Sequence, residues 1–254
     1  MGTFGRRLLL AVDAKGYGGV DVLTQRLFQE TIDRLLSEAA EETGLQHDSW
    51  VTQEGGDSVL AVLPEGASEP DLVDPFMRRL DAGLRGFNHG RLPEAWLRLR
   101  AAVHFGTASP APVGFVGRAP VEIGRILDSR PLRAALDTAV DSCLAVAVSG
   151  AVFNDVVQEA YTTFRTQEFR KVRIQQKEYR GHAWLWVPGV DLRTVDLGDG
   201  TDLGEGDSGQ VQNASGGEVD AVRPPDAPAA SGGSVVTVNY GTVHAERAVF
   251  GIHY

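Results

Sequence analysis

A short apolar run that ends in an acidic residue and a glycine-rich turn constrains the fold of this chain most. Residues 8–12 are all apolar, Asp13 follows them, and Gly16 and Gly18 flank Tyr17. A run of this length, bounded by turn residues, is typical of a buried strand. Such a strand would place Asp13 at its carboxyl end, where α/β-type sheets bind their ligands. Because glycines let the backbone approach a ligand closely, we expect the N–H groups of Gly16, Tyr17 and Gly18 to bind phosphate.

The rest of the first 189 residues predicts an α+β domain. Two β-rich runs flank a glycine pair in residues 49–63, which indicates a hairpin with Asp57 at its turn. Helical spacing occurs in residues 22–43, 71–87, 120–127, 131–139 and 151–158, and further strand-like runs are 96–106, 144–148, 169–174 and 182–187. Because helices and strands intermix, we expect a mixed sheet with helices on one or both faces.

The composition changes twice near the end of the chain. Residues 190–233 are rich in Gly, Asp, Ser, Ala and Pro, and residues 191–226 hold nine acidic residues against two arginines. Most of the net charge of −10 therefore belongs to a segment with too little apolar surface to fold, which predicts a disordered linker. Residues 234–254 are again β-branched and aromatic. We divide the chain into a domain at 1–189, a linker at 190–233 and a β-prone segment at 234–254.

Several classes of protein are disfavoured. No apolar run approaches the roughly 20 residues of a membrane span, and the apolar run after Arg6 and Arg7 lacks a cleavage site for a signal peptide. The single cysteine, Cys143, excludes an internal disulfide framework. No basic surface suggests nucleic acid binding. We therefore expect a cytoplasmic protein that binds neither membranes nor nucleic acids.

Asp13 and Asp57 are candidate metal ligands. Each lies at a predicted strand end or hairpin turn. Mg²⁺ and Mn²⁺ bind to a few carboxylate oxygens together with substrate phosphate oxygens. Turn aspartates that only cap or solvate the backbone are the alternative interpretation of the same two residues.

Four motifs, in order, resemble those of class III nucleotidyl cyclases. Residues 13–17 are similar to the first metal-binding strand and turn of that family, Asp-x-x-Gly-Phe/Tyr, and residues 56–61 to its Gly-Asp hairpin. Residues 100–106 look like the next core strand, Arg-x-Gly-Ile-His-x-Gly. Residues 144–153 are similar to a later strand and helix that contain Val-Ser-x-x-Val-Phe/Tyr. The resemblance covers about residues 6–188.

The resemblance implies a ferredoxin-like core that forms a head-to-tail homodimer. It implies that Asp13 and Asp57 bind two divalent ions, Mg²⁺ or Mn²⁺. The ribose 3′-hydroxyl of a nucleoside triphosphate would then attack the α-phosphate, giving a 3′,5′-cyclic nucleotide and pyrophosphate. Arg125 of the partner would stabilise the transition state.

Two positions depart from the family pattern. Gln53 stands where purine-specific members have a base-reading residue, which is lysine in adenylyl cyclases. The family also carries an asparagine four residues before an arginine. If Arg125 is that arginine, Val121 stands at the asparagine position. If the alignment is shifted by one residue, Glu122 stands at the asparagine position and Ile126 replaces the arginine. The altered base pocket is compatible with bacterial members that make cyclic pyrimidine nucleotides in antiphage signalling, and equally with an inactive enzyme.

The β-prone segment 234–254 resembles the amyloid signalling motifs of bacterial immune-receptor-associated proteins. Its high β-propensity, few charges and glycine turns are typical of segments that stack into cross-β assemblies. An extra edge strand or a disordered end are the alternatives. The resemblance implies an immune-receptor partner that recruits or clusters the attached domain. Two functions follow from the sequence: an active nucleotidyl cyclase, or an inactive cyclase-fold adaptor that dimerises and acts through this segment.

Overall fold

The apolar run identified above forms the central strand β1 (Gly5–Ala14). The structure is a computed structural model, and it describes residues 5–111 and 114–198. Leu8, Leu10 and Val12 face one hydrophobic core, while Leu9 and Ala11 face a second core on the other side of the sheet. Because both faces of β1 are covered, the strand is continuously apolar rather than alternating.

A mixed sheet runs through the domain, as the sequence predicts. Its order is β2-β3-β1-β4-β6-β8-β7, and the short β5 pairs with the end of β4. The pair β4–β6 is parallel and the other described pairs are antiparallel. The strands after β1 are β2 (Val51–Glu54), β3 (Ser58–Val62), β4 (Leu99–Pro110), β5 (Phe115–Val116), β6 (Leu144–Ser149), β7 (Arg170–Gln176) and β8 (Tyr179–Trp186).

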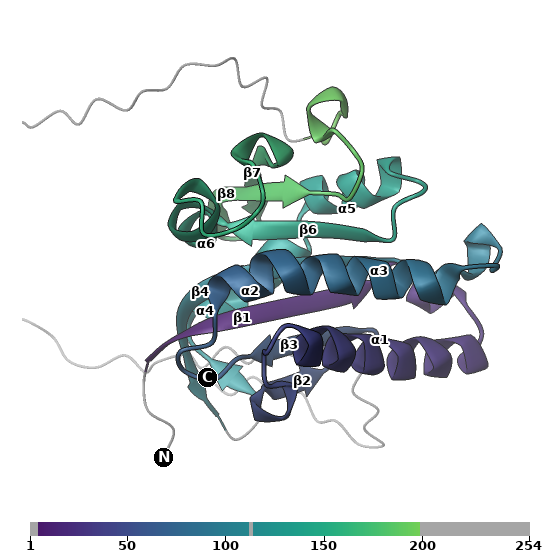
Figure 1. Cartoon of the computed structure of the whole chain (residues 1–254), viewed down its shortest axis with the longest axis horizontal. Helices are drawn as coiled ribbons and strands as arrows, with labels where there is room; N and C mark the ends of the chain where they lie inside the picture. The colour runs from purple at the N-terminus through teal and green to yellow at the C-terminus, as the bar shows by residue number, and fades with distance from the viewer. Residues whose placement is uncertain (1–4, 112–113, 199–254) are drawn as a thin grey trace, which may run out of the picture. The chain divides into compact units, whose positions relative to one another are not determined.

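Helices cover both faces of the sheet. The long helices α1 (Val22–Glu42) and α3 (Met77–Asn88) lie side by side over one face (Figure 1). The other face is covered by α4 (Arg118–Leu127) and α5 (Arg130–Thr138), whose apolar side chains complete the second core. The arrangement is the predicted α+β architecture with three layers.

Two predicted helices contain irregular turns. The segment expected at 71–87 begins as α2 (Glu69–Asp71), passes through a π-type turn at Leu72–Phe76, and continues as α3. Pro75 lies inside that turn and has no N–H to donate, which explains the widened hydrogen-bonding pattern. A second π-type turn, Phe153–Gln158, follows α6 (Gly150–Val152).

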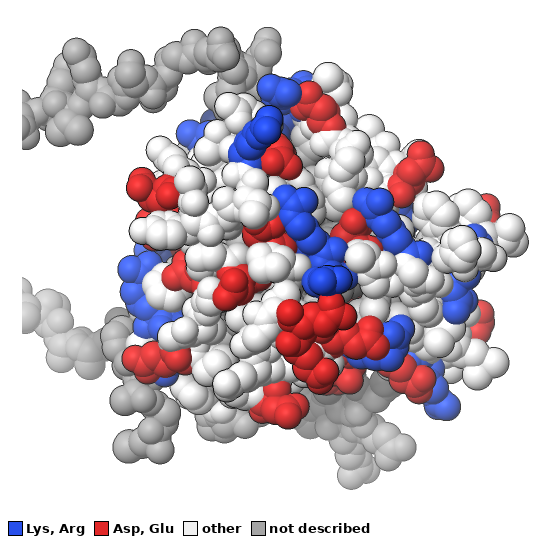
Figure 2. All heavy atoms as spheres, in the orientation of Figure 1, with Lys and Arg blue, Asp and Glu red and all other residues white. Residues whose placement is uncertain are grey.

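The outer face of α1 and α3 is a mixed, solvated surface. Acidic and basic side chains are interspersed over the face shown in Figure 2. Ion pairs join them, as in Arg34–Glu38 within α1 and Arg79–Glu42 between α3 and α1. Within the described ranges, no helix is long and apolar enough to cross a membrane.

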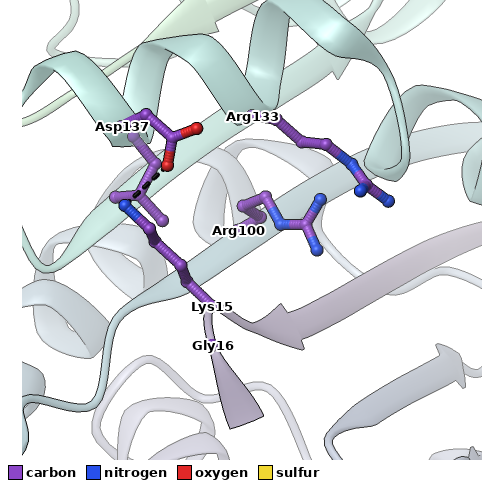
Figure 3. Close-up of a pocket in the computed structure, with 6 residues that line it drawn as sticks. Lys15, Gly16, Arg100, Arg133 and Asp137 are labelled. Carbon is purple, nitrogen blue, oxygen red and sulfur yellow. Dashed lines mark ion pairs between the residues drawn. The ribbon is translucent and has the colours of Figure 1, made fainter. Parts of the chain in front are cut away.

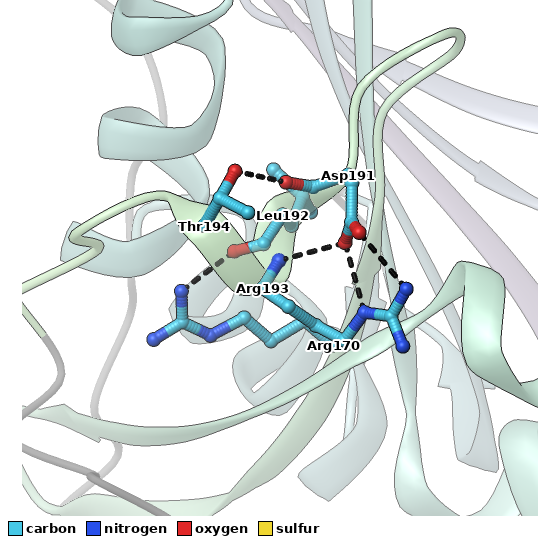
Figure 4. Close-up of polar contacts among 5 residues, drawn as sticks. All are labelled: Arg170, Asp191, Leu192, Arg193 and Thr194. Carbon is cyan, nitrogen blue, oxygen red and sulfur yellow. Dashed lines mark hydrogen bonds and ion pairs between the residues drawn. The ribbon is translucent and has the colours of Figure 1, made fainter.

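The chain that follows β8 packs against the domain as far as the described residues extend. Leu192 and Leu197 are buried in the second core. The guanidinium of Arg170 donates to the backbone carbonyls of Leu192 and Val195, and Asp191 pairs with Arg193 (Figure 4). Most of the predicted linker and the whole segment 234–254 lie outside the described residues, so the division of the chain beyond residue 198 stays a prediction.

Candidate functional site

Asp13 and Asp57 come together at one end of the sheet. Asp13 is near the end of β1, and Asp57 occupies the turn between β2 and β3. The strands β1 and β3 pair so that Asp13 lies opposite Ser58, and the N–H of Ala14 donates to the carbonyl oxygen of Asp57 at 3.1 Å. The hairpin therefore brings the second carboxylate beside the first.

A buried arginine completes this group. Arg100, near the start of β4, lies directly opposite Asp13 in the β1–β4 pairing, and one of its Nη atoms forms an ion pair with the Asp13 carboxylate. Its other Nη atom is buried and has no hydrogen-bond partner among the described residues. An unpartnered buried donor is costly, and an anion that reached it would recover that cost.

Arg100 was not among the site residues predicted from the sequence. The residue opens the strand motif at 100–106, but a motif on one strand does not show which residue lies across from it. The register between β1 and β4 supplies that information.

Burial and mutual repulsion shape the charges of the acidic pair. Burial raises the pKa of Asp13 above its ordinary value; Arg100 opposes this shift, while Asp57 and Asp128 add to it. Burial also raises the pKa of Asp57, again against the influence of Arg100. Both carboxylates are therefore held where a divalent cation would relieve their repulsion and desolvation.

The donor set fits a metal that keeps substrate and water ligands. Over residues 5–111 and 114–198, no cluster of three or more His, Cys, Asp or Glu side chains could enclose a metal ion by itself. Two neighbouring carboxylates are instead suited to Mg²⁺ or Mn²⁺, which complete their coordination with waters and phosphate oxygens.

The glycine-rich turn presents free backbone donors next to the acidic pair. Gly16 has a positive φ of 78°, which opens the short 3-10 turn Tyr17–Gly19. In the described chain, the hydrogen bonds of this turn use the N–H groups of Gly19 and Val20, and those of Gly16, Tyr17 and Gly18 donate to no other group. The start of α1 is different, because the Asp21 carboxylate already accepts from its first N–H groups.

Arg125 does not meet the acidic pair within one chain. It lies on α4, is only 6% exposed, and donates to the Glu178 carboxylate at 2.9 Å. Glu178 lies in the turn between β7 and β8, and the pairing of β8 with β6 puts that turn at the end of the sheet away from Asp13.

Gln53 lies two strands away from Asp13 in the sheet. It lies on β2, on the strand side of the hairpin rather than at its turn. Its side chain packs against Gly114 so closely that a Cβ at that position would collide with it. The Gln53 amide therefore lies against the loop before β5.

Solved structures of cyclases share this fold. The guanylyl cyclase Cya2 is 13% identical with a TM-score of 0.51, and the match covers 77% of this chain and 98% of that one. An adenylate/guanylate cyclase/hydrolase from Silicibacter pomeroyi is 16% identical with a TM-score of 0.53, covering 74% of this chain and 99% of that one. The described core thus has the class III adenylate/guanylate cyclase fold. No protein-family model and no curated protein matches the sequence.

Proposed function

We propose that this chain is a metal-dependent nucleotidyl cyclase, which converts a nucleoside triphosphate into a 3′,5′-cyclic nucleotide and pyrophosphate. One observation carries the proposal. On a cyclase fold, Asp13 and Asp57 lie next to each other beside the buried guanidinium of Arg100. Paired carboxylates with an adjacent cation are the groups that phosphoryl-type transfer needs for positioning and charge neutralisation.

Each part of the site has a role in this proposal. Asp13 and Asp57 would hold two Mg²⁺ or Mn²⁺ ions, which when bound neutralise phosphate oxygens and favour loss of the 3′-hydroxyl proton. The free N–H groups of Gly16, Tyr17 and Gly18 would bind phosphate oxygens. Arg100 would exchange its contact with Asp13 for one with phosphate once a metal ion neutralises that carboxylate.

The remaining two predicted residues require a second copy of the chain. Arg125 is held by Glu178, and Gln53 lies two strands from Asp13 of its own chain. In a homodimer they would serve the site of the partner, Arg125 at the transition state and Gln53 at the base. Arg125 would then have to leave Glu178, an exposed carboxylate that competes weakly for it.

The proposed substrate base rests on position 53, where this sequence lacks the lysine of adenylyl cyclases. A glutamine amide offers both a donor and an acceptor, which can pair with the adjacent acceptor and donor groups on the edge of a nucleobase, a pyrimidine among them. We therefore propose a pyrimidine nucleoside triphosphate as substrate. An antiphage signalling role, with an immune-receptor partner bound through residues 234–254, belongs to the same proposal and rests on sequence resemblance alone.

The test is turnover by the full chain. We would incubate it with each of the four ribonucleoside triphosphates and Mn²⁺, and measure pyrophosphate release and cyclic product by mass spectrometry. Asp57→Ala is the control. Consumption of one triphosphate that depends on Asp57 supports the proposal and identifies the base; no turnover by the folded protein contradicts it.

A non-catalytic adaptor is the second candidate. It is favoured because two proposed site residues already have partners within the chain. Asp13 pairs with Arg100, and Arg125 pairs with Glu178. An adaptor would keep its signalling activity in Asp13→Ala and Asp57→Ala and lose it when residues 234–254 are deleted. An enzyme would lose signalling in all three variants.

A further inference from the structure

A small basic cavity lies beside the acidic pair. Its volume is about 190 Å³, and its lining comes from the turn that follows β1, from β4 and from α5. The lining residues are Lys15, Gly16, Arg100, Arg133, Leu136 and Asp137. Figure 3 shows Lys15 and Asp137 meeting on one side, with Arg100 between that pair and Arg133. Three cationic side chains therefore surround the cavity against one carboxylate in its lining.

The two outer cations are held by ion pairs that an anion could replace. Lys15 Nζ is 2.6 Å from an Asp137 carboxylate oxygen, and an Arg133 Nη atom is 2.7 Å from one of Asp128. The four side chains are 37–59% exposed. Exposed ion pairs of this kind contribute little to stability, so a multiply charged anion competes with them effectively.

The inner cation connects the cavity to the acidic pair. Arg100 lines the cavity and also contacts Asp13, and its second Nη atom lacks a partner within the described ranges. Gly16, whose N–H is free in the described chain, lines the same cavity. A polyphosphate held near Asp13 would therefore continue into this cavity without leaving the protein surface.

We propose that the cavity binds the terminal phosphates of the substrate and the pyrophosphate product, with Arg133 and Lys15 of the same chain as their cationic ligands. This inference rests on the proposed function and assigns a role to α5 in it. Arg133 can bind phosphate oxygens with two N–H groups at once, and Lys15 supplies a compact charge. Asp137 and Asp128 hold these side chains in position when no phosphate is bound.

The test is binding of inorganic pyrophosphate to the full chain in EDTA, measured by isothermal titration calorimetry. Arg133→Gln and Lys15→Gln should each weaken binding about tenfold, because each removes a charge-assisted contact. Asp137→Asn should tighten binding by about twofold to fivefold, because it frees Lys15 from its exposed partner. Arg79→Gln, which removes a similarly exposed ion pair on α3, should leave binding unchanged.

The outcomes separate this inference from the function on which it rests. It is overturned if the wild-type chain does not bind pyrophosphate, if Arg133→Gln behaves like Arg79→Gln, or if Asp137→Asn weakens binding. A folding defect cannot mimic the tighter binding expected of Asp137→Asn. Because the measurement needs neither metal nor nucleoside, pyrophosphate binding without turnover of any triphosphate contradicts the enzyme and supports the cavity. Turnover of a triphosphate without pyrophosphate binding supports the enzyme and contradicts the role proposed for the cavity.

Discussion

At the scale of single residues, the charge on Asp57 gives the most direct test of metal binding. Its pKa is raised by burial, so ionised Asp57 lowers stability above that pKa, and this cost disappears as the pH falls below the ordinary value of 3.8. Without metal, Asp57→Asn should raise the melting temperature at pH 7 and have no effect at pH 3. With Mn²⁺ at about 100 times its Kd, the wild type should gain about 5–10 °C and the variant nothing.

The control for this experiment is Asp48→Asn. Asp48 is an exposed acid that precedes the same hairpin. It should keep the full response to Mn²⁺ and gain nothing at pH 7. A normal Mn²⁺ response in Asp57→Asn would show that the acidic pair is not the metal site.

Single residues also show where sequence-based prediction ends. Asp13, Asp57 and the glycine turn were predicted because strand ends and turns can be recognised from local patterns. Arg100 and Arg133 were given no role because their partners depend on strand register and on where α5 packs. The roles of Arg125 and Gln53 depend on a second chain, so both roles stay predictions in the structure of a single chain.

At the scale of elements, the helices and strands were predicted well where one pattern governs the whole segment. The helix expected at 22–43 is Val22–Glu42, and the strand expected at 144–148 is Leu144–Ser149. The helix expected at 71–87 instead contains the turn around Pro75. Apolar periodicity continues through that turn, so the irregularity comes from hydrogen bonding that periodicity does not report.

The same irregular turn contains a buried carboxylate that stabilises it. Asp74 is 3% exposed and accepts hydrogen bonds from the N–H and hydroxyl of Thr163 at 2.6 and 2.7 Å, and from Arg78 at 2.6 Å. Burial alone would raise the pKa of Asp74, but these bonds outweigh it and hold the pKa below its ordinary value. The carboxylate therefore joins the turn to the segment before β7.

Asp74→Asn should lower the free energy of unfolding by about 2–4 kcal/mol at pH 7, since it weakens bonds to a buried charge. A lowered pKa means that the contribution is complete above 3.8 and is lost as the pH falls through the folded-state value. The difference between variant and wild type should therefore shrink below pH 3.8 in urea titrations. Asp33→Asn, on the exposed side of α1, should change stability little; equal stability of Asp74→Asn and wild type at pH 7 would contradict the assignment.

At the scale of the whole molecule, the two ends of the sheet carry different parts of the proposed site. The acidic pair, the glycine turn and the basic cavity lie together, whereas Arg125 is held by Glu178 at the far turn. A two-fold symmetric dimer places the same surface of both chains at the interface, so each chain can complete the site of the other. The separation within one chain is thus what a shared site requires.

This arrangement predicts complementation between two inactive variants. Asp57→Ala keeps Arg125, and Arg125→Ala keeps the acidic pair, so a mixed dimer contains one intact site and one site that lacks both groups. If the chains exchange freely, half of the dimers are mixed, and an equal mixture should recover about a quarter of wild-type activity. Each variant alone should be inactive. A mixture of Asp57→Ala with Asp13→Ala is the matched control, because neither of its chains has a complete acidic pair. Recovery in the control would place the acids on different chains, and no recovery in the first mixture would place Arg125 outside the shared site.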